Sequence, residues 1–94
     1  MSLTNSFTFS QIRIELAQLN FDRNAIPTLT NLINNTVNNL SQGGPSLNNK
    51  EIINHLNDLL ENLKDIYSYR EEQQLSIFDQ IVSEFKDILN EIEL

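Results

Sequence analysis

Apolar residues recur along most of the chain at spacings of three and four residues, and this periodicity is the feature that most limits the fold. Such spacing places one apolar stripe along a helix, whereas a half-buried strand alternates apolar and polar residues. No stretch of useful length alternates in that way. The sequence therefore predicts an all-α protein in which each helix buries one face.

Four segments carry such a stripe, and we predict helices at about residues 9–20, 25–41, 49–67 and 69–93. The stripes are formed, in chain order, by Phe9, Ile12, Leu16 and Leu19; by Ile26, Leu29, Leu32, Ile33, Val37 and Leu40; by Ile52, Ile53, Leu56, Leu59, Leu60, Leu63, Ile66 and Tyr67; and by Phe78, Ile81, Val82, Phe85, Ile88, Leu89 and Ile92. A helix with one apolar stripe needs another element to cover it, so the four segments are expected to pack together.

Helix-start signals support the first three of these segments. Thr8 stands three residues before Gln11, and Asn48 stands three residues before Glu51. In each pair the two side chains are predicted to satisfy each other's free backbone amides at a helix N-terminus. Pro27 fits only the first turn of a helix, where its missing N–H has no partner to lose. These signals place helix starts near residues 9, 25 and 49.

Two breaks divide the rest of the chain. Gly43 and Pro45 mark the clearer one, because glycine accepts the left-handed position after a helix and proline cannot continue it. A second break is predicted between Tyr67 and Leu75, because the apolar stripes on either side are out of phase. Ser68 and Glu71 match a third capping pair, which would start the last helix at residue 69.

The predicted architecture is a single helical domain over residues 1–94, folded as a small antiparallel four-helix bundle. The alternative is a helical hairpin with its turn at residues 43–44 that dimerises into a bundle. In that case the last two segments would join into one helix of about 45 residues, roughly 68 Å long. Such a helix is too long for a compact monomer of this size.

The formal net charge of −7 lies entirely on the second half of the chain. Up to residue 49 there are two basic and two acidic residues, whereas from residue 50 onward four basic residues stand against eleven acidic ones. A surface with this bias repels nucleic-acid phosphates and anionic lipid, and attracts a basic partner. We therefore expect neither a nucleic-acid partner nor a membrane partner.

Residue types that carry chemistry are scarce. The chain has no cysteine and a single histidine, His55, and its only two glycines form no phosphate-binding loop. Glu51 and Asp58 lie about one turn before and after His55, but three side chains from one helix rarely converge on a metal ion. Acid–base catalysis would need carboxylates in a dry pocket, and those of this chain follow polar stripes. We expect no enzyme activity, no metal and no cofactor.

The absence of cysteine and of a signal-like N-terminus favours a soluble, cytoplasmic protein. Its expected function is that of a small acidic protein-binding module that neutralises or chaperones a basic protein partner, as an immunity protein, antitoxin or secretion chaperone would. The plan of a short acidic four-helix bundle resembles that of bacteriocin immunity proteins, in architecture alone. The alternative function is a structural subunit, either self-assembling as a homodimer or part of a larger complex.

The residues expected to contact the partner are the acidic positions of the last two helices and the aromatic and basic residues between them. Tyrosine and arginine are enriched among the residues that contribute most to protein interfaces. The candidate partner-binding residues are Asp58, Glu61, Asp65, Tyr67, Tyr69, Arg70, Glu84, Asp87 and Glu91. Asp58, Glu61 and Asp65 were expected to follow one side of their helix, as were Glu84, Asp87 and Glu91.

Overall fold

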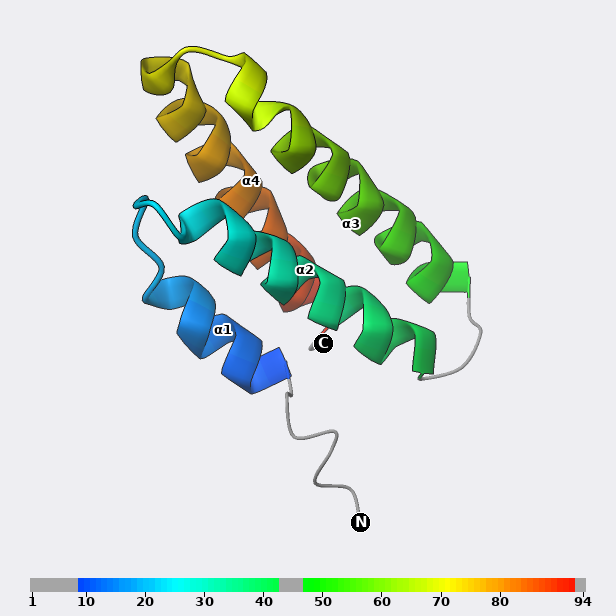
Figure 1. The fold of residues 1–94 in the computed structure, drawn as a ribbon. Helices are drawn as coiled ribbons and strands as arrows, with labels where there is room; N and C mark the ends of the chain where they lie inside the picture. The colour runs from blue at the N-terminus through cyan, green and yellow to red at the C-terminus, as the bar shows by residue number, and fades with distance from the viewer. Residues whose placement is uncertain (1–8, 43–46, 93–94) are drawn as a thin grey trace.

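Four α-helices and one short 3-10 helix make up the fold of the computed structural model, which describes residues 9–42 and 47–92 (Figure 1). The elements are α1 (Phe9–Ala17), α2 (Ala25–Gln42), α3 (Leu47–Asp65), the 3-10 helix η2 (Ile66–Ser68) and α4 (Glu71–Ile92). Successive helices run in opposite directions. The predicted all-α, antiparallel four-helix bundle is therefore confirmed. None of the described helices is long and apolar enough to cross a membrane.

Contacts join each helix to its neighbours in the bundle. In the described part of the chain α2 packs against α1 and α3, and α4 packs against α1, α3 and, across the centre, α2. Figure 1 shows α4 lying behind α2 and α3, so that α1, α2 and α3 form the face seen in that view. Each apolar stripe is thereby covered within one chain, and the dimerising hairpin is not needed to bury it.

The core contains the stripe residues predicted from the periodicity. Its buried members are Ile12, Leu16, Ile26, Leu29, Leu32, Ile33, Leu40, Leu56, Leu59, Leu63, Ile66, Phe78, Ile81, Phe85, Ile88 and Leu89, with Ala25 beside them. Leu19, Val37, Ile52, Ile53, Leu60 and Val82 are partly buried against this cluster. The side chains of Phe9 and Ile92 lie outside the described part of the structure.

Thr36 is the one fully buried polar side chain among the described residues, and periodicity did not predict it. Its hydroxyl donates a hydrogen bond to the carbonyl oxygen of Leu32, 2.9 Å away and one turn earlier in the same helix. This local bond satisfies the hydroxyl without a partner from another helix. A threonine can therefore occupy a core position that the pattern assigns to an apolar residue.

The first helix ends at Ala17 and not near residue 20. The amide of Gln18 donates to the carbonyl oxygens of both Ile14 and Glu15, each at 3.2 Å, and the amide of Leu19 donates to that of Leu16, also at 3.2 Å. Bonds to the third preceding residue tighten the last turn and satisfy carbonyls that the helix end leaves free. The Thr8 cap predicted for the start of this helix lies outside the described residues.

The third helix begins at Leu47, two residues earlier than predicted, so Asn48 lies inside the helix and is not its N-cap. The neighbouring Asn49 acts on the preceding helix, because its side-chain amide donates to the carbonyl oxygen of Leu40 at 3.4 Å. That carbonyl belongs to the last turn of α2, where no intrahelical donor remains. The asparagine pair at this position thus includes a residue that supports the end of α2.

The predicted break between the last two helices is present, at residues 66–70. Ser68 is not the N-cap of α4, because its hydroxyl donates back to the carbonyl oxygen of Asp65 at 2.6 Å. Tyr69 is extended, with φ −99° and ψ 164°, and α4 begins at Glu71 rather than at residue 69. The side chain of Gln74 closes the turn by donating to the Tyr69 carbonyl oxygen at 2.9 Å.

The 3-10 turn also explains why Tyr67 lies outside the core, although its position in the stripe predicted that it would cover the core. Ile66 is completely buried, whereas Tyr67 is 65% exposed. Tyr67 belongs to the 3-10 helix that follows α3, so the buried part of the stripe ends at Ile66. The aromatic side chain of Tyr67 remains on the surface.

Candidate functional site

The nine candidate partner-binding residues lie in two hollows beside α3, just before α4 and on the last turns of α4. Asp58, Glu61 and Tyr67 line a hollow between α2 and α3. The other set, Asp65, Tyr69 and Glu84, lines a separate hollow between α3 and α4. Asp58, Glu61 and Asp65 are all exposed on α3, but Asp65 lies at the edge that faces α4 and lines a different hollow from the other two.

The remaining three candidates lie away from the α2–α3 hollow. Arg70 is exposed immediately before α4, in the segment that connects it to the 3-10 helix. Asp87 and Glu91 are exposed on the last two turns of α4, and Glu84 one turn earlier is half-buried at the α3–α4 hollow. The acidic residues thus follow the surfaces of two helices and do not form one compact cluster.

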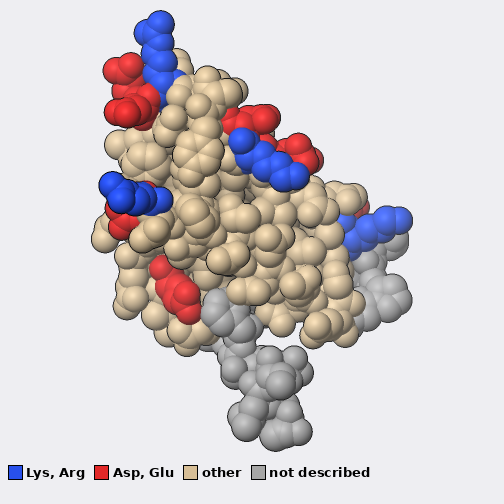
Figure 2. Space-filling model, in the orientation of Figure 1, with Lys and Arg blue, Asp and Glu red and all other residues tan. Residues whose placement is uncertain are grey.

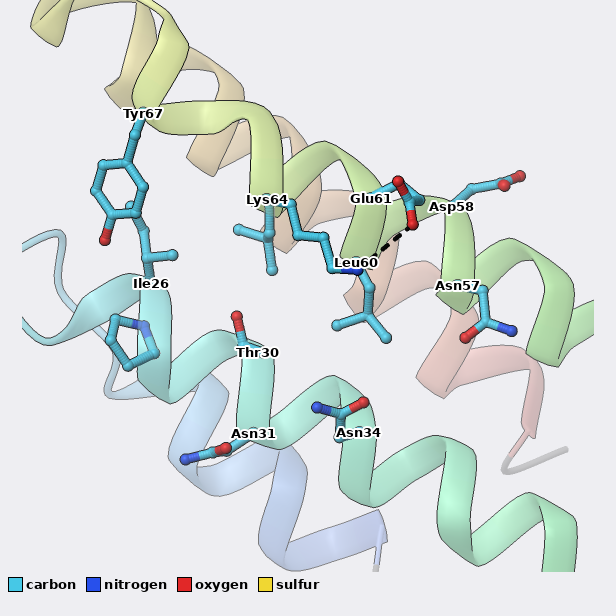
Figure 3. A pocket seen from close by; sticks show the side chains of 12 residues that line it. Ile26, Thr30, Asn31, Asn34, Asn57, Asp58, Leu60, Glu61, Lys64 and Tyr67 are labelled. Carbon is cyan, nitrogen blue, oxygen red and sulfur yellow. Dashed lines mark ion pairs between the residues drawn. The ribbon is translucent and has the colours of Figure 1, made fainter.

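The hollow between α2 and α3 has a volume of about 750 Å³, which is within the range of ligand-binding clefts. Its apolar lining comes from Ile26 and Pro27 in the first turn of α2 and from Leu60 and Leu63 in α3. Figure 3 shows the side chain of Tyr67 extending from the 3-10 helix after α3 toward Ile26 in the first turn of α2. We call this hollow the α2–α3 groove.

Amide side chains form the walls of the α2–α3 groove. Asn31 and Asn34 line it from α2, and Asn57 lines it from α3. In Figure 3, Thr30 and Asn34 point toward α3, and Asn57 points toward α2. Asn31 and Asn34 are both exposed, and neither was among the predicted partner-binding residues. The sequence did contain a signal for this uncharged wall, because none of the eighteen residues of α2 carries a charge.

Charge enters the groove from one side. Asp58, Glu61 and Lys64 are contributed by α3, and the ammonium of Lys64 lies 3.6 Å from a carboxylate oxygen of Glu61. Both side chains are at least 70% exposed, so this pair contributes little to stability. Figure 2 shows the same face of the molecule in space-filling form, with large uncharged areas between scattered charged side chains.

The smaller hollow between α3 and α4, about 200 Å³, has a polar edge. Glu84 lies 3.3 Å from the Nε2 atom of His55 and 3.3 Å from the side-chain nitrogen of Gln80. His55 is therefore paired with the neighbouring helix and not with Glu51 or Asp58 of its own. Among the described residues no group of three or more histidine, cysteine or acidic side chains is arranged to hold a metal ion.

A third hollow, of about 210 Å³, lies where α1 meets the last turns of α4. Arg13 reaches across it, and its Nη2 atom donates to the carbonyl oxygen of Leu89 at 3.0 Å. That carbonyl is among the last four of α4, which have no intrahelical donor. A cation near the C-terminus of a helix also interacts favourably with the helix dipole. From the sequence, Arg13 contributed only to the charge balance, and its bond to the end of α4 was not predicted.

Comparison with protein-family models, with curated proteins and with known structures found no match to this chain. The surface features that could serve recognition are the two hollows beside α3 and the excess of acidic side chains on α3 and α4.

Proposed function

We propose that this protein is a protein-binding module that recognises a basic segment of a partner protein and thereby neutralises or chaperones it. The observation that supports this most directly is the distribution of charge over the helices. α4 carries six acidic residues and one basic residue, α3 carries four and two, and α1 and α2 together carry one of each. A field of this kind increases the rate at which a basic partner meets the acidic side of the bundle.

The consumption of the apolar stripes in the core supports the same proposal. Since the four helices cover one another's stripes, the bundle does not require a second chain to complete its core. The change of phase between the last two stripes, which favoured a self-assembling subunit, is accounted for by the 3-10 turn at Ile66–Ser68. We therefore prefer a monomeric binding module to a structural subunit. Its proposed location is the cytoplasm, as expected from the absence of cysteine.

The experiment starts from a pull-down with the tagged protein in its native organism, followed by mass spectrometry and by association kinetics with the purified partner. We expect a basic partner whose association rate falls steeply as salt rises toward physiological ionic strength, where the screening length is about 8 Å. Lysine substitutions at Asp58 and Glu61, or at Asp87 and Glu91, are expected to slow association.

The matched control replaces Glu15 and Asp22 by lysine, because these two acidic residues lie in the neutral half of the chain. Equal effects from all three pairs, or an affinity indifferent to salt, would contradict the proposal. Self-association of the purified protein at micromolar concentration, seen by light scattering, would favour the structural subunit instead.

A further inference from the structure

We infer that the α2–α3 groove binds an extended, non-helical segment of the partner that places an apolar side chain near Tyr67 and a lysine or arginine near Asp58 and Glu61. This inference rests on the proposed function and adds to it the site, the conformation and the side-chain pattern of the bound segment. It follows from three features of the groove: an apolar end, an acidic end and walls of amide side chains.

The apolar end is formed where α3 gives way to the 3-10 turn. Tyr67 is 65% exposed and extends toward Ile26 of the opposite helix (Figure 3), and Pro27 lines the groove next to Ile26 in the sequence. A large aromatic side chain left in water beside apolar neighbours gains free energy when another apolar side chain covers it. This end therefore suits an aliphatic or aromatic residue of the bound segment.

The acidic end lies about two turns along α3. Asp58 makes no ion pair within the described part of the chain, and Glu61 has only its exposed contact with Lys64. Because exposed ion pairs are weak, Glu61 can exchange Lys64 for a cation of the partner at little cost. The opposite wall contributes no charge, since α2 has none. The acidic end is therefore complementary to a lysine or arginine.

The walls between these ends favour an extended backbone. Each asparagine amide offers two donors and one acceptor oxygen, and within the described chain those of Asn31, Asn34 and Asn57 bond to no other protein group. An extended segment has free backbone N–H and C=O groups for such amides to pair with. A helix satisfies these groups internally, so it would leave the amides only its side chains.

The length of the groove predicts how many residues separate the apolar and the basic side chain in an extended segment and in a helical one. Along α3 and the 3-10 turn, Tyr67 is six positions from Glu61 and nine from Asp58, a distance of roughly 9 to 14 Å at about 1.5 Å per residue. An extended chain advances about 3.3 Å per residue and covers this distance in about three to four residues. A bound helix would need about six to nine residues. The separation between the apolar and the basic residue therefore reports the conformation of the bound segment.

The test uses a displayed library of random linear twelve-residue peptides, selected on the full-length protein. We expect enrichment of peptides with an apolar residue and a lysine or arginine about three to four positions apart. In NMR spectra these peptides should shift the side-chain amide signals of Asn31, Asn34 and Asn57. Alanine at Asn34 and Asn57 together should weaken binding on the order of tenfold, from the loss of two to three hydrogen bonds.

The matched control replaces Asn38 and Asn54 by alanine, which removes the same side chains from exposed positions of the same two helices outside the groove. This double variant should bind the selected peptides as the parent does. Thermal melts of both double variants will show whether either substitution disturbs the fold.

Three results would overturn the inference: no enriched peptide, a spacing of about six to nine residues with helical circular dichroism in the bound peptide, or equal affinity of the two double variants. These results leave the proposed function to its own test. Salt-dependent association with the native partner that responds to Asp87 and Glu91, but not to Asn34 and Asn57, would retain the function and place recognition on α4.

Discussion

Replacement of Arg13 by methionine tests whether the contact between α1 and the end of α4 holds the shortest helix in place. α1 has nine residues, which is too short for a stable helix on its own, so tertiary contacts must support it. Methionine keeps most of the apolar stem of arginine but removes the donor that reaches the Leu89 carbonyl oxygen at 3.0 Å. The substitution therefore removes the guanidinium, including its bond to Leu89, and keeps most of the side-chain packing.

The expected loss follows from the geometry of this bond. A hydrogen bond with one charged partner contributes about 1.5 to 3 kcal/mol, and half-burial of Arg13 places the expected loss near the lower limit, about 1.5 to 2 kcal/mol. The total stability of a chain of this length is about 5 to 14 kcal/mol. With a urea dependence of about 1 to 1.5 kcal/mol per molar, the denaturation midpoint should fall by roughly 1 to 2 M.

Urea denaturation followed by circular dichroism measures this change, and Arg23→Met serves as the control. Arg23 is exposed in the loop between α1 and α2, where substitutions usually change stability by less than about 0.5 kcal/mol. Hydrogen exchange should show faster exchange in α1 of the Arg13 variant than in α3. If the two variants unfold at the same urea concentration, the bond between α1 and α4 does not stabilise the bundle.

Three further predictions concern packing, the turn and the surface. Phe85→Ala should cost about 3 to 5 kcal/mol and lower the melting temperature by at least roughly 12 °C, whereas Leu75→Ala, at a side chain that is 45% exposed, should change it little; equal melting temperatures would mean that Phe85 is not in the core. Amides at residues 67–70 should exchange faster than those near Leu60, and uniform protection through this region would indicate one continuous helix. His55→Gln should change the free energy of unfolding by less than about 0.5 kcal/mol, because its pair with Glu84 is solvent-exposed; a loss above 1 kcal/mol would show that the pair is structural.

Periodicity was sufficient to predict the helices and most of the core, because burial of an apolar stripe is the main force that shapes a chain of this kind. Periodicity was less successful at the helix ends, where a polar side chain can form hydrogen bonds with alternative backbone groups. Ser68 bonds to the Asp65 carbonyl instead of capping α4, and Asn49 supports the end of α2. Ser68 has two local alternatives, the carbonyl three residues before it and the amides of the next helix, and Asn49 meets Leu40 only when the two helices pack. Residue spacing alone does not determine which partner is taken.

The geometry of the candidate site could not be predicted for a similar reason. The acidic residues of α3 and α4 are exposed, except for the half-buried Glu84, but which hollow each one lines depends on how the neighbouring helices are rotated. Asp65 faces α4 although its spacing groups it with Asp58 and Glu61. The roles of Arg13 and of the amide walls require knowledge of two helices at once, and a single helical stripe does not contain that information.

The absence of charge in α2 gives the two walls of the groove different responses to salt. Hydrogen bonds to Asn31 and Asn34 and apolar contacts with Ile26 are not screened by ions, whereas the attraction of Asp58 and Glu61 for a cation is. The binding free energy of any groove ligand should therefore decline with added salt and then level off. The binding free energy at the plateau measures the contribution of the uncharged residues of the groove. The size of the decline measures the contribution of the acidic residues of α3. A single salt titration thus separates the contribution of the charged residues of α3 from that of the uncharged lining of both helices, without a substitution in either.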